Sequence, residues 1–200
     1  MDSIIKKYQQ KFRKVKAELS RWDELQTRLT SQFSNAASII QRLQVIQDSG
    51  NYGILKCVKG IEAAVLGKQM ESLQTILLSM NDTLEEFRGV VSSLGMIVHD
   101  SRQLAGVGSS QSTTKQLRQR IGIKPSLENC LDGLRLLEDM HEAEYLLKLS
   151  VVSALPALAL KPSASADLGA LQQLLVDQPN IHQEEGEFML PAEIQWWNVP

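Results

Sequence analysis

Apolar side chains recur every three or four residues at the start of the chain. The successive steps are three, four, three, four and three, which is the spacing of one helix face in a heptad repeat. These positions are Ile5, Tyr8, Phe12, Val15, Leu19 and Trp22. Asp2 stands where it can cap the helix, and the register slips at Leu25 before it resumes at Ala36. This drift of the apolar stripe favours packing inside a bundle.

The first helix is predicted to be very long. No proline occurs before residue 125, and the first cluster of turn-forming residues spans residues 48–53. A helix of more than forty residues would measure roughly 60 Å at 1.5 Å per residue. Because isolated helices are marginally stable, it must pack against other segments along most of its length.

Two more helical segments are expected before the middle of the chain. The residues from Ile54 to Leu66 form a short amphipathic run, and Gly67 is placed to cap or kink it. A second long helix, with apolar residues again three or four positions apart, is predicted from Lys68 to about Leu104.

The second half begins with a segment of small and polar residues at 105–124, which predicts a flexible linker. A third long helix should start with Ser126 as its N-cap and end near Leu155, before Pro156. A short helix follows at about 167–177.

The predicted fold is therefore all-α: an elongated bundle of three long helices plus short helices, with a flexible linker and a C-terminal tail. The domain division expected is a helical bundle over residues 1–155 and a second part over 156–200. That second part holds the short helix and an acidic, partly disordered tail.

Composition agrees with a helical protein. The chain is 43% apolar but only 5% aromatic, and it lacks the frequent turn signals of β-rich proteins. No run of about 18 apolar residues is present, so a soluble, non-secreted chain with no membrane contact is expected. Cys57 and Cys130 stand alone in the sequence, and both are predicted to be reduced core side chains.

The net charge of −2 hides an uneven distribution. Residues 1–60 hold eleven Lys or Arg against five acids, and residues 101–125 hold five against none. The N-terminal cluster is expected to be a solvated face with its aliphatic stems packed down. The basic linker, with Arg118, Arg120 and Lys124, is the better candidate for a partner-binding or weak RNA contact, directed at phosphates.

Motifs for catalysis are not found. His141-Glu142 begins like a zinc-protease signature, but the second histidine would have to stand where Tyr145 does. His141 falls on the apolar stripe and is expected to be a packed core residue. Gly106-Val107-Gly108 lacks the remainder of a phosphate loop. We therefore expect no enzyme activity, no catalytic residue, no cofactor and no metal.

The pair Trp196 and Trp197 near the end of the chain is a candidate anchor for a partner, because tryptophan is enriched at interface hot spots. The alternative is a tail that folds back onto the bundle of its own chain. The sequence leaves both possibilities open.

The order of the segments resembles that of a known protein family. Trp22 is central in the long first helix, Gly67-Lys68-Gln69-Met70-Glu71 precedes the second, and Pro125-Ser126-Leu127-Glu128 opens the third. Over residues 15–176 this layout is similar to that of small helical ribosome-maturation factors that bind a two-ring AAA ATPase. In the closing segments the likeness lies in Leu131, Leu134, Tyr145, Leu149, Asp167, Leu168 and Leu171.

The resemblance implies a non-catalytic adaptor in late maturation of the large ribosomal subunit. Such an adaptor would work with the AAA ATPase and a companion helical subunit to release and recycle assembly factors from pre-60S particles. It would be found in the cytoplasm and the nucleus. Two alternatives remain open: a structural coiled-coil subunit of a cytoskeletal, tethering or transcription-related assembly, and a helical RNA-binding protein.

Overall fold

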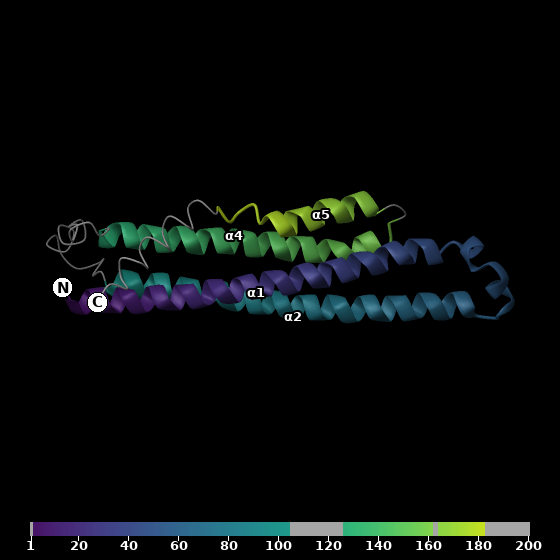
Figure 1. Cartoon of the computed structure of the whole chain (residues 1–200), viewed down its shortest axis with the longest axis horizontal. Coiled ribbons are helices and arrows are strands. Elements are labelled where there is room, and N and C mark those ends of the chain that lie inside the picture. The colour runs from purple at the N-terminus through teal and green to yellow at the C-terminus, as the bar shows by residue number, and fades with distance from the viewer. Residues whose placement is uncertain (1, 105–125, 162–163, 183–200) are drawn as a thin grey trace. The chain divides into compact units, whose positions relative to one another are not determined.

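A computed structural model describes residues 2–104, 126–161 and 164–182 of the chain (Figure 1). All regular secondary structure in these ranges is helical, which confirms the predicted all-α class. The elements are α1 (Asp2–Ile46), the 3-10 helix η1 (Ser49–Cys57), α2 (Ile61–Leu104), α4 (Leu127–Ala159) and α5 (Ser165–Asp177). Within these ranges, no helix combines the length and the apolar character that crossing a bilayer requires. The linker predicted at 105–124 lies outside the described residues, as does the tail from residue 183.

The first helix has the length that the sequence predicts, and it ends where the turn-forming cluster begins. The Asp48 carboxylate accepts a hydrogen bond from the backbone N–H of Gly50 at 2.8 Å. Two side chains of η1 donate back to the last carbonyls of α1: Asn51 to Val45 O at 2.7 Å, and Tyr52 to Ile46 O at 2.9 Å. These bonds satisfy acceptors that the end of a helix leaves without partners.

The helix expected from Ile54 to Leu66 is not formed. A 3-10 helix occupies the first part, and α2 begins at Ile61 and continues through Gly67. The break lies at two glycines with positive φ, Gly53 at 49° and Gly60 at 83°, a conformation that glycine adopts at little cost. Gly67 inside a helix costs only about 1 kcal/mol relative to alanine, too little to end a helix that packs well on both sides.

The third helix was predicted to end before Pro156, and this prediction is wrong. α4 begins after its predicted cap, where the backbone N–H of Asn129 donates to Ser126 Oγ at 3.2 Å, but it runs to Ala159 with Pro156 inside. Proline removes one intrahelical hydrogen bond. Near the end of the helix the neighbouring Leu155 and Ala159 are almost completely buried, and their packing keeps the last turn helical.

The chain forms two compact units, which we describe separately. Unit 1 comprises residues 1–24, 87–145 and 179–200, and unit 2 comprises residues 25–86 and 146–178. The predicted division at residue 155 stays a prediction.

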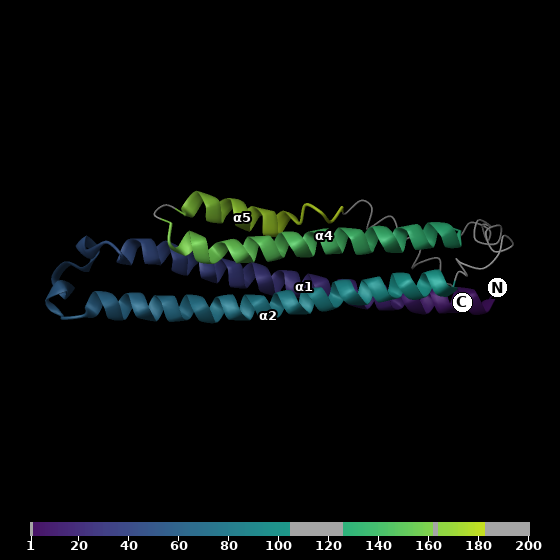
Figure 2. The same cartoon turned by 180° about the vertical axis from the view of Figure 1, so that it is seen from behind.

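In unit 1, α1 and α2 run antiparallel and side by side (Figures 1 and 2). As residue numbers rise along α1 they fall along α2. Tyr8 donates to the carbonyl of Ser101 at 2.9 Å, and Glu18 accepts from Ser93 Oγ at 2.7 Å. The two helices therefore keep one register throughout the unit.

The first half of α4 completes the core of unit 1. Its His141 ring packs edge-on against Trp22, with the ring centroids 4.7 Å apart. The approach of α4 to α2 is close at Gly95, where an added Cβ would lie 2.8 Å from Glu138 Oε1. The heptad positions Tyr8, Phe12, Val15 and Trp22 are all buried in this core, as the apolar pattern predicts.

In unit 2, the second half of α1 packs against α2 and α5. Gln32 Nε2 donates to Ser79 Oγ of α2 at 2.8 Å, and Gln26 Nε2 donates to the carbonyl of Leu175 in α5 at 2.5 Å. The largest side chains of its core are Phe33, Leu29, Ile40, Leu43, Met80, Leu155, Leu168 and Leu175. α5 ends at Gln178, whose left-handed conformation (φ 44°) and the following Pro179 stop the helix.

Three burial predictions need correction. Cys130 is buried as expected, but Cys57 is exposed because it ends η1, outside the long helices. Leu55 and Val58, predicted to face the core, lie in the same turn and are about half exposed. Leu149 is also exposed on α4, so the stripe of that helix turns away from this position.

Candidate functional site

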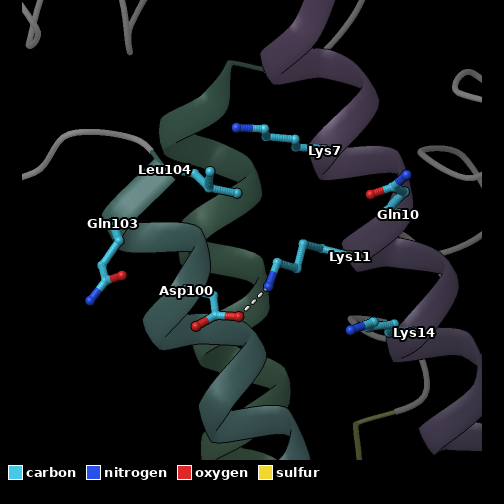
Figure 3. A pocket seen from close by; sticks show the side chains of 7 residues that line it. All are labelled: Lys7, Gln10, Lys11, Lys14, Asp100, Gln103 and Leu104. Carbon is cyan, nitrogen blue, oxygen red and sulfur yellow. Dashed lines mark hydrogen bonds and ion pairs between the residues drawn. The ribbon is translucent and has the colours of Figure 1, made fainter.

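The candidate binding residues identified from the sequence are Arg118, Arg120, Lys124, Trp196 and Trp197. All five lie outside the described residues, so their roles stay predictions. The candidate site within the described part of the chain is a basic groove in unit 1, between the start of α1 and the end of α2 (Figure 3).

The heptad seam determines where the lysines of this groove lie. Lys7, Lys11 and Lys14 each stand one residue before the buried positions Tyr8, Phe12 and Val15. Residues four and three positions apart share one helix face, so the three lysines form a row at the edge of the buried stripe. Figure 3 shows their side chains extending from α1 toward α2.

The opposite wall comes from the last turns of α2, where Asp100, Gln103 and Leu104 stand three and four residues apart. Together with Gln10 of α1, these residues and the lysine row enclose a groove of about 510 Å³. The end of α2 is held against α1 by the buried Tyr8 hydroxyl. Burial, with a smaller contribution from the nearby Cys130 thiol, raises the pKa of Tyr8 to about 12, so its proton stays on the bond to Ser101 O.

One ion pair crosses the groove: Lys11 Nζ contacts Asp100 Oδ2 (Figure 3). The Lys11 side chain is only 15% exposed, whereas that of Asp100 is 53% exposed. The hydrogen bond and the charge of Lys11 hold the pKa of Asp100 below its ordinary value, with small contributions from His99 and Lys14. The carboxylate is therefore ionised at neutral pH and fixes the position of Lys11.

Lys7 and Lys14 remain exposed at the two ends of the row. Three ammonium groups against one carboxylate leave the groove with a formal charge of +2, close to the positive end of the α1 dipole. Lys7 also lies near the last residue of α2, where a cation interacts favourably with the terminal carbonyls. The arrangement can bind an anion; it offers no pair of groups for acid and base catalysis.

The sequence analysis treated this N-terminal cluster as a solvated face, and for Lys11 the packed stem is as predicted. It did not identify the groove. The signal was present in the spacing, because each lysine precedes a seam residue. The partner wall could not be found, since the register of α2 against α1 depends on contacts between residues 93 positions apart.

His141 has the packed role that its place on the apolar stripe predicts. Its ring is 3% exposed, and its Nδ1–H donates to the carbonyl of Leu137 at 2.7 Å. Among the described residues, no three His, Cys, Asp or Glu side chains come together as a metal ion would require.

Several large apolar side chains remain exposed on the described helices and in η1. The most exposed in each region are Ile54, Leu78, Met96, Leu146 and Leu160. Leu146 and Leu149 stand three residues apart on α4, so both lie on one face of that helix. Exposed apolar side chains that cluster on a surface are typical of contact sites for other proteins.

These features define an all-α protein with a cationic groove and exposed apolar positions on its helices. A family comparison matches residues 2–194 to the C1orf109-like ribosome biogenesis proteins (CA109-like), and the chain belongs to this family. No curated protein matches the chain. The resemblance to a ribosome-maturation factor is thereby confirmed at the level of ribosome biogenesis.

Proposed function

We propose that the protein is a non-catalytic adaptor of a two-ring AAA ATPase complex in late maturation of the large ribosomal subunit. In this role it promotes the release and recycling of assembly factors from pre-60S particles. The observation that carries the proposal is membership of a ribosome biogenesis family over residues 2–194. The segment order that resembles ATPase-binding maturation factors supplies the finer role.

The burial of the heptad seam supports an adaptor over the coiled-coil alternative. Tyr8, Val15 and Trp22 are at most 2% exposed within this single chain. A seam that is filled by α2 and α4 of its own chain leaves no apolar stripe for a second coiled-coil strand. The long helices then act as a support that presents surfaces to other subunits.

The exposed apolar residues of α4 support contact with a companion helical subunit. Leu146 and Leu149 are about half exposed, on the half of α4 that belongs to unit 2. Apolar residues at this spacing are the anchors by which one helix recognises another. The proposed adaptor acts in both cytoplasm and nucleus, because pre-60S particles mature in both.

The test is purification of the tagged full-length chain from cells, followed by quantitative mass spectrometry. We expect an AAA ATPase, a small helical protein and large-subunit assembly factors to be enriched over a tag-only control. Recovery of the chain without an ATPase and without pre-60S proteins would overturn the proposal. A chain that sediments as a homodimer through α1 would instead favour the coiled-coil alternative.

A further inference from the structure

The basic groove of unit 1 carries a row of positive charges. At 1.5 Å per residue, the α-carbons of Lys7, Lys11 and Lys14 are about 6 Å and about 4.5 Å apart along the α1 axis. All three side chains extend toward the same side (Figure 3). Evenly repeated point charges suit a linear polyanion, whose own charges recur along one direction.

The lining of the groove indicates which part of a polyanion it can hold. None of its seven lining residues is aromatic, and Leu104 is the one large apolar side chain among them. Stacking of bases on a protein needs aromatic or guanidinium surfaces. The groove is therefore suited to the phosphate backbone, and the amides of Gln10 and Gln103 at its margins can bond to phosphate or ribose oxygens.

The same lining argues against an acidic protein as the occupant. Tight protein interfaces depend on a few apolar or aromatic anchors in desolvated pockets, and a groove with one leucine offers little for them. An RNA strand needs no such anchor, because release of counterions from its phosphates provides most of the binding free energy.

We propose that Lys7, Lys11 and Lys14 form an RNA-binding site that holds the phosphate backbone of a single strand without sequence preference. The site goes beyond the adaptor role, because it gives the chain a contact of its own with the RNA of the particle. Asp100 positions Lys11 and, as a fixed negative charge, lowers the affinity of the groove for phosphate.

The experiment measures binding of a fluorescent single-stranded RNA of about 20 nucleotides to the purified full-length chain, by anisotropy, over a series of salt concentrations. The test variant is K7Q/K14Q, which removes two exposed charges and leaves the Lys11–Asp100 pair intact. K56Q/K59Q is the matched control, because it removes two exposed lysines at and just after η1 in unit 2. Circular dichroism checks that each variant remains helical.

For K7Q/K14Q we expect about a tenfold weaker Kd at low salt, and a fall of about 1.4 in the slope of log K against log salt, at about 0.7 per lost phosphate contact on a single strand. K56Q/K59Q should leave both quantities unchanged. Asp100→Asn should strengthen binding several-fold and raise the slope by about 0.7, because it frees Lys11 for a third phosphate contact.

Three results would overturn the site. K7Q/K14Q and K56Q/K59Q could have equal effects, or binding could be lost only in R118Q/R120Q/K124Q, which would assign RNA contact to the basic segment after α2. Polyglutamate of equal charge could displace the probe as well as unlabelled RNA does, which would indicate an acidic peptide as ligand. Since the assay contains no ATPase, its outcome is independent of the purification that tests the adaptor role.

Discussion

The indole ring of Trp22 packs edge-on against the ring of Phe87, with centroids 4.6 Å apart and an interplanar angle of 76°. His141 approaches the same indole from α4 at 4.7 Å. Trp22 is 2% exposed and Phe87 is fully buried. Three helices thus meet on one aromatic side chain, which makes Trp22 the central packing residue of unit 1.

Replacing Trp22 with alanine should remove this packing and leave a large cavity. We expect a loss of about 3 to 5 kcal/mol in the free energy of unfolding, typical of a buried tryptophan truncated in a core. Urea denaturation followed by circular dichroism measures it. Trp22→Phe keeps most of the apolar surface and should cost less; equal losses for the two variants would contradict the assignment.

Two glycines of α2 form a matched pair. An alanine Cβ at Gly89 meets no atom within 4 Å, whereas at Gly95 it meets the Glu138 carboxylate at 2.8 Å. Gly89→Ala should therefore stabilise the protein by about 1 kcal/mol through helix propensity alone. Gly95→Ala should gain less, because the Glu138 side chain must move. Thermal unfolding of the two variants gives the comparison, and equal gains would show that α2 and α4 are not in close approach there.

The Tyr8 hydroxyl predicts a specific alkaline sensitivity. Its pKa is raised from 10.0 to about 12 in the folded state, so the unfolded chain loses this proton first as the pH rises. The contribution to stability is complete below about pH 10 and is lost as the pH rises to about 12. Tyr8→Phe should be less stable at neutral pH by about 1 kcal/mol, for the lost bond to Ser101, but its stability should fall less between pH 10 and 12.

Pro156 offers a gain in stability. It is exposed, and its ring nitrogen cannot donate to the carbonyl of Val152 within α4. Pro156→Ala should restore that bond and stabilise the protein by about 1 to 3 kcal/mol. Chemical denaturation measures the change, and a destabilised variant would mean that the proline ring makes a contact that the helix needs.

The exposed face of α4 predicts a separable effect on partner binding. L146S/L149S should reduce recovery of the companion subunit by at least about tenfold, because two apolar anchors are lost, while stability changes by less than about 0.5 kcal/mol. S150A/S153A, on exposed positions of the same helix, is the matched control. Quantitative co-purification with the tagged variants measures the effect; unchanged recovery would place the interface elsewhere.

The helices and their core faces follow from the sequence wherever local pattern decides them. The seam from Tyr8 to Trp22 predicts the buried face of α1, Ser126 predicts the cap of α4, and the turn-forming residues from Asp48 predict the end of α1. Each of these signals acts within one or two helical turns, so neighbouring residues contain the necessary information.

The errors arise where packing between distant segments overrides local preference. Pro156 lies in the helix because buried neighbours hold the last turn, and Leu55 is exposed because two glycines redirect the chain. The groove depends on Lys11 meeting Asp100, 89 residues further along the chain. The apolar pattern predicts that α1 needs a partner but does not give the register of that partner.

The pairing of Tyr8 with Ser101, 93 residues apart, has a consequence for synthesis of the protein. At 5 to 20 residues per second, α1 emerges from the ribosome roughly 5 to 20 s before the end of α2 that covers its apolar face. During that interval Tyr8, Phe12 and Val15 have no partner within the chain. The nascent protein therefore depends on chaperones, or on its slow appearance on one ribosome at a time, to avoid association of exposed helices before it folds.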